Sequence, residues 1–87
     1  MRPKPDVIAR RLGSSIVLVN LQTSRIYELN ATGARIWELL VEGHELDAIE
    51  TALAAEFDAA AVNVKDEVAR LVDTVRNEGL VDVDDSR

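Results

Sequence analysis

The sequence predicts an α+β domain in which a three-stranded antiparallel sheet is followed by three helices. Two observations support this prediction. The first thirty residues hold three short segments that are β-branched or alternate in polarity, and the rest of the chain holds three segments with apolar residues at helical spacing. Since three strands can bury only one face of their sheet, we expect the helices to cover that face.

The three strands are expected between the proline-containing N-terminus and Asn30. Their expected ranges are residues 7–12, 15–21 and 25–29. Gly13-Ser14 and Gln22-Thr23-Ser24 are turn signals that separate these segments. The middle segment is apolar and β-branched, which predicts a strand largely covered on both faces, whereas the last segment alternates as a half-exposed strand does. Segments this close in sequence favour an antiparallel meander.

Three helices are expected after the sheet, and capping residues mark their ends. Their expected ranges are about 31–42, about 46–57, and a third helix between Asn63 and Gly79. Asn30 is a suitable N-cap for the first helix, and Gly43 suits its C-terminal end.

The third helix has the clearest predicted ends. A connector is expected at residues 58–62, after which Asn63 caps the helix with Asp66 in the position of a capping box. Gly79 suits the residue that follows the helix, and Leu80 is expected to fold back onto Val75.

The core is expected to be aliphatic, because the chain has only one Phe, one Trp and one Tyr. Trp37 is assigned to the core-facing side of the first helix with Ile36 and Leu40. The core stripes of the second and third helices are Leu46, Ile49, Leu53 and Phe57, followed by Val64, Val68, Leu71 and Val75.

Size and composition restrict the possible functions. With 87 residues, the chain is expected to form a single domain, with an ordered core at about 7–81 and an acidic tail at 82–87. The absence of cysteine excludes disulfides, thiolate zinc sites and thiol nucleophiles. No apolar run suits a signal peptide or the ~20 residues of a membrane span, so a cytoplasmic protein without a membrane partner is expected.

The inventory of side chains predicts no catalytic site. His44 is the single histidine and follows Gly43 in a loop, with no second histidine to share a metal. The four glycines are scattered and form no phosphate loop, and no serine, threonine or lysine lies in a nucleophile motif. We therefore expect a binding protein rather than an enzyme, without a cofactor.

The distribution of charge argues against nucleic acid as a partner. Residues 1–44 carry a net charge of +2 and residues 45–87 one of −8, which together give −6. The expected arrangement is like a winged-helix domain with its sheet placed first, and winged-helix domains often bind DNA. However, an acidic half repels phosphate backbones, and the third helix carries more acidic than basic side chains. DNA binding is kept only as an alternative.

The strand at residues 25–29 is the candidate binding element. In a meander it lies at the edge of the sheet, where unpaired N–H and C=O groups invite another strand. Arg25 and Glu28 protect this edge only modestly, and no proline blocks it. One interpretation is that a helix covers the edge; the other is that an extended peptide adds to it as a strand.

Two further features have an ordinary and a functional interpretation. The stripe Lys65, Ala69, Val72 and Arg76 is either a plain flank of the third helix or the floor of a peptide groove with basic ends. Tyr27 is either a core aromatic with its hydroxyl at the rim or part of the same groove.

The run Tyr27-Glu28-Leu29-Asn30-x-x-Gly33-x-x-Ile36-Trp37, with the strand residues 17–21 before it, resembles PqqD-like proteins. Apolar residues of the second and third helices and the closing Gly79-Leu80-Val81 follow in the family's order, so the resemblance covers about residues 7–81. It implies a RiPP recognition element, a domain that binds the leader segment of a ribosomally made precursor peptide.

The resemblance also implies that the leader adds as a strand beside residues 24–29 and packs on the third helix. The predicted peptide-binding residues are Ser24, Arg25, Ile26, Tyr27, Glu28, Leu29, Lys65, Val68, Ala69, Val72, Asp73 and Arg76. The run Asn20-Leu21-x-Thr23 suits the stand-alone leader-binding protein of lasso peptide biosynthesis, which serves a separate leader peptidase. A PqqD-type chaperone for a radical SAM enzyme, and a dimer formed by pairing two edge strands, are the alternatives.

Overall fold

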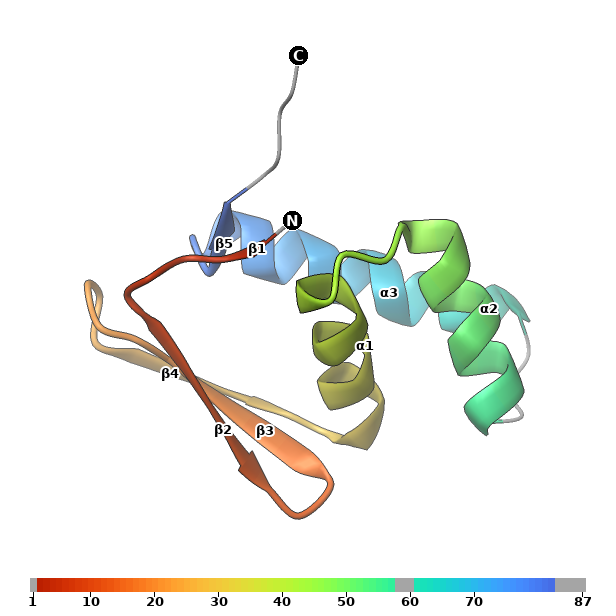
Figure 1. The fold of residues 1–87 in the computed structure, drawn as a ribbon, viewed down its shortest axis with the longest axis horizontal. Coiled ribbons are helices and arrows are strands. Elements are labelled where there is room, and N and C mark those ends of the chain that lie inside the picture. The colour runs from red at the N-terminus through yellow and green to blue at the C-terminus, as the bar shows by residue number, and fades with distance from the viewer. Residues whose placement is uncertain (1, 58–60, 83–87) are drawn as a thin grey trace.

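The structure is a computed structural model that describes residues 2–57 and 61–82. Its central element is an antiparallel sheet of β2 (Val7–Leu12), β3 (Ser15–Asn20) and β4 (Arg25–Leu29), in the order β2-β3-β4. The helices that follow are α1 (Ala31–Val41), α2 (Leu46–Phe57) and α3 (Ala61–Asn77). The predicted α+β arrangement is confirmed, and Figure 1 shows the helices gathered to one side of the sheet.

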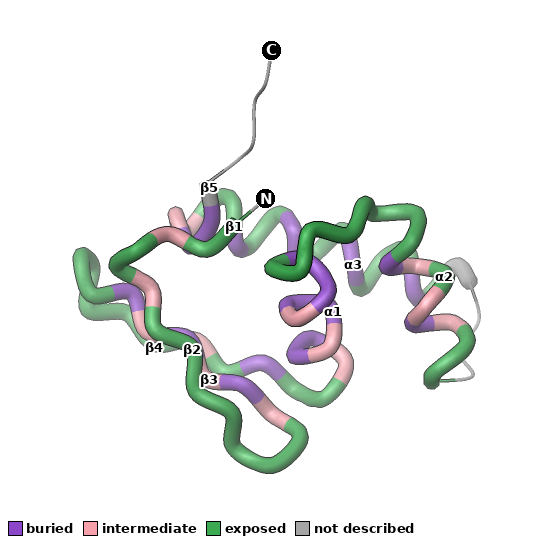
Figure 2. Tube along the Cα trace, in the orientation of Figure 1, coloured by how far each residue is buried: buried purple, intermediate pink, exposed green. Residues whose placement is uncertain are grey.

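The sheet buries only one of its faces. Along the central strand β3, Ile16, Leu18 and Asn20 are buried, whereas the alternate residues Val17 and Val19 are only half-buried. Ile8, Arg10, Ile26 and Glu28 on the second face are exposed. In Figure 2 the tube along β2 is mostly in the colour of exposed residues. The expectation that the middle strand is covered on both faces is wrong, because the helices pack on one face alone.

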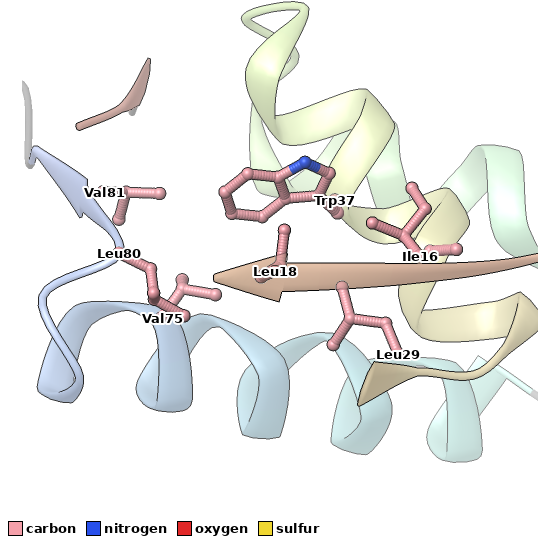
Figure 3. Packing of buried hydrophobic residues seen from close by; sticks show 8 residues of the cluster. Ile16, Leu18, Leu29, Trp37, Val75, Leu80 and Val81 are labelled. Carbon is pink, nitrogen blue, oxygen red and sulfur yellow. The ribbon is translucent and has the colours of Figure 1, made fainter. Parts of the chain in front are cut away.

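Two largely aliphatic clusters form the core. The first joins the sheet to α1 and to the C-terminal end of α3 (Figure 3), and its buried members are Ile16, Leu18, Leu29, Ala34, Trp37, Val75, Leu80 and Val81. The second lies among the three helices, and its buried members are Ile36, Leu39, Leu40, Ile49, Leu53, Val64, Val68 and Val72. The assignment of Trp37 to the core is confirmed. At the two ends of α2, Leu46 and Phe57 are more exposed than the predicted stripe implies.

The predicted ends of α1 are confirmed. The side-chain oxygen of Asn30 accepts a hydrogen bond from the N–H of Gly33 at 2.9 Å, as an N-cap does. At the other end Gly43 has a φ of 96°, which favours glycine, and the N–H of His44 donates to the carbonyl of Leu39 at 3.1 Å. Local capping chemistry therefore sets the length of this helix.

The start of α3 differs from the prediction. The helix already includes Ala61, so Asn63 lies inside its first turn rather than before it. Alanine has the highest helix propensity of all residues, which favours an earlier start. The connector was expected to extend to residue 62, but residues 61 and 62 already belong to α3. Residues 58–60 of the expected connector lie outside the described part of the chain.

Two short strands were not predicted. β1 (Arg2–Pro3) pairs antiparallel with β5 (Val81–Asp82), and the N–H of Lys4 donates to the carbonyl of Leu80 at 3.1 Å. Regular structure therefore begins before the first predicted strand, and Asp82 belongs to β5 rather than to the expected acidic tail. Strands of two residues are too short to show a periodic pattern in the sequence.

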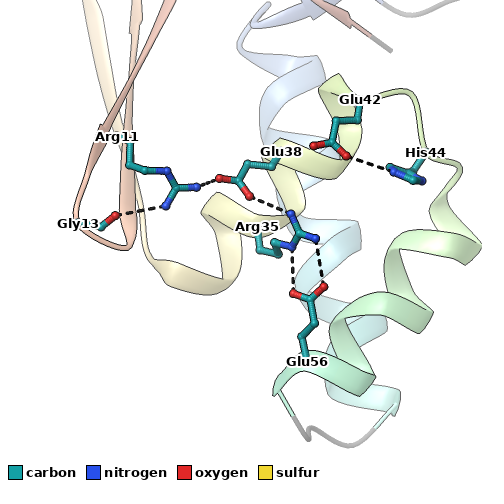
Figure 4. Close-up of polar contacts among 7 residues, drawn as sticks. All are labelled: Arg11, Gly13, Arg35, Glu38, Glu42, His44 and Glu56. Carbon is teal, nitrogen blue, oxygen red and sulfur yellow. Dashed lines mark hydrogen bonds and ion pairs between the residues drawn. The ribbon is translucent and has the colours of Figure 1, made fainter.

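Ion pairs on the surface connect α1 to its neighbours (Figure 4). Arg11 of β2 pairs with Glu38, and Arg35 pairs with Glu38 at 3.0 Å and with Glu56 of α2 at 2.9 Å. The hydrogen bond to Glu56 raises the pKa of Arg35, so this side chain stays charged. Exposed pairs of this kind each contribute about 0–1 kcal/mol, so packing of the two clusters dominates the stability of the fold.

Gly79→Ala is expected to destabilise the protein by about 1–2 kcal/mol, since Gly79 has a φ of 68° that strains any residue with a Cβ. The turn is fixed by a 2.8 Å hydrogen bond from the N–H of Leu80 to the carbonyl of Val75. Urea unfolding measures the change. Gly33→Ala is the matched control, because Gly33 is helical and an added Cβ would lie 3.4 Å from its nearest neighbours. Equal losses for the two variants would contradict the strain at Gly79.

Candidate functional site

β4 is an edge strand, as predicted. Among the residues that the structure describes it pairs with β3 alone, in a register that runs from Arg25 opposite Asn20 to Leu29 opposite Ile16. In an antiparallel pair, alternate residues direct their N–H and C=O groups away from the partner strand. These groups of β4 are therefore open to hydrogen bonds from another chain.

A groove of about 650 Å³ lies between β4 and α3. Three elements line it, and their lining residues are Ile26, Tyr27, Glu28, Leu29 and Asn30 from β4 and its end, Gly33 and Ile36 from α1, and Glu67, Arg70, Leu71 and Thr74 from α3. The four α3 residues follow the i, i+3, i+4, i+7 spacing of a single helix face. The groove thus joins an open strand edge to one side of a long helix.

The groove combines an apolar floor with a charged rim. Leu29 and Ile36 are buried, and Leu71 is half-buried in contact with both core clusters. Glu67 and Arg70 are exposed on the helix side, and in the described part of the chain neither forms an ion pair. A ligand would therefore meet aliphatic surface at the bottom and one charge of each sign at the rim.

The strand part of the predicted site coincides with the groove, except at its start. Ile26, Tyr27, Glu28 and Leu29 line the groove, as expected of an edge that faces it. Ser24 and Arg25 are not among the lining residues. Ser24 lies in the hairpin turn with a φ of 63°, and Arg25 is directed to the residue that follows α3.

The helix part of the predicted site does not line the groove. Val68 and Val72 are 1% and 5% exposed, belong to the second core cluster and are not among the residues that line the groove. The other four expected residues are exposed on α3 outside the groove, and these are Lys65, Ala69, Asp73 and Arg76. The face of α3 that lines the groove carries three polar residues and one leucine, and this mixture gives no amphipathic signal in the sequence.

A polar cluster ties the end of α3 to the sheet. The hydroxyl of Tyr27 donates to the carboxylate of Glu78 at 2.5 Å, and the Arg25 guanidinium donates to the same carboxylate at 3.2 Å. The side chain of Asn20 donates to the backbone carbonyl of Glu78 at 3.3 Å. The ring of Tyr27 packs against the first core cluster while the residue also lines the groove, so both interpretations of Tyr27 apply. Glu78 thereby holds the C-terminal end of α3 against β3 and β4.

The hydrogen bond to Glu78 is the main cause that raises the pKa of Tyr27 above its usual value of 10.0. Tyr27 is the single tyrosine, so the phenolate absorbance of the folded protein reports this group alone. We expect the midpoint of the Tyr27 titration to lie above pH 10. Glu78→Gln should lower this midpoint, and Arg25→Gln should raise it because Arg25 favours the phenolate. Because the folded pKa is the raised one, this contribution to stability is complete below pH 10 and is lost as pH rises through the folded pKa. A midpoint that Glu78→Gln leaves unchanged would contradict the assignment.

Other site types have no counterpart in residues 2–57 and 61–82. No group of three or more His, Asp or Glu side chains there is placed to hold a metal ion. His44 lies in an exposed loop with its ring 3.3 Å from the Glu42 carboxylate (Figure 4). Residues 2–57 and 61–82 include no helix that is long and apolar enough to cross a membrane.

A known protein family matches most of the chain. The family described as coenzyme PQQ synthesis protein D (PqqD) matches residues 15–81. The chain belongs to the PqqD family. The match to PqqD includes every residue that lines the groove. No curated protein matches the sequence.

Two solved structures resemble this PqqD-family chain over nearly its whole length. TbiB1, solved in complex with the TbiA(beta) leader peptide, has a TM-score of 0.84 and 29% sequence identity, over 94% of this chain and 95% of its own. Lasso peptide synthetase B1, solved in complex with the leader peptide, has a TM-score of 0.83 over 94% of this chain and 96% of its own. At 22% identity the second likeness concerns the fold alone.

Proposed function

We propose that this PqqD-family chain binds the leader segment of a ribosomally made precursor peptide and presents it to the enzymes that process it. The observation that supports this most directly is the open edge of β4 beside a groove walled by α3. The likeness to TbiB1, which was solved with a leader peptide, supports the same function. The chain contributes recognition and no catalytic group.

The leader adds to β4 as a further strand of the sheet. Main-chain hydrogen bonds to the outward groups of β4 supply affinity without regard to sequence, and side chains supply specificity. Because side chains alternate along a strand, every second residue of the leader enters the groove between β4 and α3. Apolar residues fit above Leu29 and Leu71, and charged residues fit beside Glu67 and Arg70.

The pathway is that of lasso peptide biosynthesis, in which a separate leader peptidase receives the bound precursor. The likeness to TbiB1, which was solved with a leader peptide, supports leader binding, and the run Asn20-Leu21-x-Thr23 suits the lasso peptide branch. A second candidate is a peptide chaperone for a radical SAM enzyme, which the description of the family as a coenzyme PQQ synthesis protein favours. The enzymes encoded beside this chain distinguish the two pathways.

Isothermal titration with a synthetic leader peptide tests the proposal. The peptide is the leader part of the precursor encoded beside this chain, and its scrambled sequence is the control. We expect saturable one-to-one binding of the leader and much weaker binding of the scrambled peptide, which keeps the main-chain hydrogen bonds but loses the matched side chains. Equal heats for both peptides, or none for either, would remove the proposed function. A duplex DNA of mixed sequence is a further control, and we expect no binding to it because the chain carries a net charge of −6.

A further inference from the structure

The face of the sheet that points away from α1 is partly apolar, and no helix or strand among residues 2–57 and 61–82 covers it. Cross-strand neighbours in register direct their side chains to the same face. Ile8, Val19 and Ile26 are such neighbours, so they form one aliphatic row across β2, β3 and β4. Ile8 is 42% and Ile26 69% exposed, although both are large apolar residues. We call this surface the outer face.

A second row of the outer face carries opposite charges at its two ends. Arg10, Val17 and Glu28 are in register across the same three strands, so one cation and one anion flank a central valine. Both charged residues are exposed, and within residues 2–57 and 61–82 neither forms an ion pair. The third row pairs Leu12, which is 61% exposed, with Ser15.

This arrangement is complementary to itself. A two-fold axis parallel to β3, between two facing sheets, exchanges the positions of β2 and β4. Ile8 of one copy then lies opposite Ile26 of the other, and Arg10 lies opposite Glu28. Val17 and Val19 each meet their own counterpart near the axis. We propose that a second copy of this chain docks on the outer face and forms a face-to-face dimer.

The alternative contact between two β2 edges is disfavoured by charge. Arg10 and Arg11 are adjacent in β2, so edge-to-edge pairing of two copies would bring four arginines together. A face-to-face dimer instead pairs each Arg10 with a carboxylate. It also leaves the main-chain groups at the edge of β4 free, while Ile26 and Glu28 belong both to the outer face and to the lining of the groove. The inference does not depend on the proposed function.

The dimer is expected to be weak. The outer face consists of eight residues on three short strands, which is a small patch for protein association. Interfaces below about 1,200 Å² belong to weak and transient complexes. Association should therefore appear in the upper micromolar to millimolar range, and sedimentation equilibrium over a concentration series of the full chain measures it.

Charge reversal tests the geometry of this dimer. Arg10→Glu and Glu28→Arg each place like charges opposite one another at two symmetric positions, so each should weaken association at least about tenfold, or ~1.4 kcal/mol. An equimolar mixture of the two variants restores opposite charges at both positions and should form a heterodimer. The variant with both substitutions should dimerise as the original chain does. Asp66→Arg is the control, because it changes the net charge by the same amount as Glu28→Arg. Asp66 is exposed on α3, away from the outer face, so this variant should associate as the original chain does.

Two results would overturn the proposal. One is a monomer at every concentration, which would leave the outer face without this occupant. The other is a dimer that Arg10→Glu and Glu28→Arg weaken no more than Asp66→Arg does, which would indicate a different interface such as pairing of β4 edges. Circular dichroism of each variant verifies folding, and we expect native spectra because both substituted residues are exposed.

Discussion

Thr74→Trp is expected to weaken leader-peptide binding by on the order of 100-fold, the scale at which central interface residues act. Thr74 is exposed and lines the groove on its α3 side. An indole at this position occupies space that the leader's side chains need, and it removes no contact of the core. Titration of the variant with the synthetic leader peptide measures the loss.

Ala69→Trp is the matched control for this experiment. Ala69 is exposed on the same helix but does not line the groove, so its variant should bind within a few-fold of the original chain. The pair of variants also decides between two faces of α3, because the sequence pattern predicted Ala69 as a binding residue. Loss of binding in Ala69→Trp with full binding in Thr74→Trp would show that the leader uses the other face.

Val72→Asp is expected to destabilise the protein by about 3–5 kcal/mol, the cost of an unpaired charge in a protein interior. Val72 is 5% exposed and packs in the second core cluster among the three helices. Domains of this size have a total stability of only about 5–15 kcal/mol, so much of the variant should be unfolded at moderate temperature. Thermal unfolding followed by circular dichroism measures the effect.

The control places the same side chain on the surface of the same helix. Ala69→Asp loses helix propensity but buries no charge, so its cost should stay below about 1 kcal/mol. A Val72→Asp variant that keeps its stability yet no longer binds the leader would mean that Val72 lines the binding site rather than the core.

The sequence predicted the three-stranded sheet, both ends of α1 and the C-terminal end of α3 because local chemistry determines them. The N-cap at Asn30 and the left-handed glycines at Gly43 and Gly79 act within a few residues of themselves. The alternating polarity along β4 likewise reflects the layer of the structure next to that strand. The edge position of β4 followed from the short connections between three consecutive strands.

The face of α3 that lines the groove could not be read in the same way. Apolar residues occupy more than one side of this helix, since Val68 and Val72 pack against α1 and α2 whereas Val75 packs against the sheet. Leu71 lies between the two clusters and also reaches the groove. Periodicity shows that such a helix is amphipathic, but the arrangement of its neighbours decides which side stays open.

Amide hydrogen exchange of β4, with and without saturating leader peptide, tests the central claim most directly. We predict that the outward-facing amides, at alternate residues between Arg25 and Leu29, exchange fast in the free protein. In the complex they should become protected, because the leader supplies the missing hydrogen-bond partners. If every β4 amide exchanged at the same rate with and without bound leader, capture by strand addition would be contradicted.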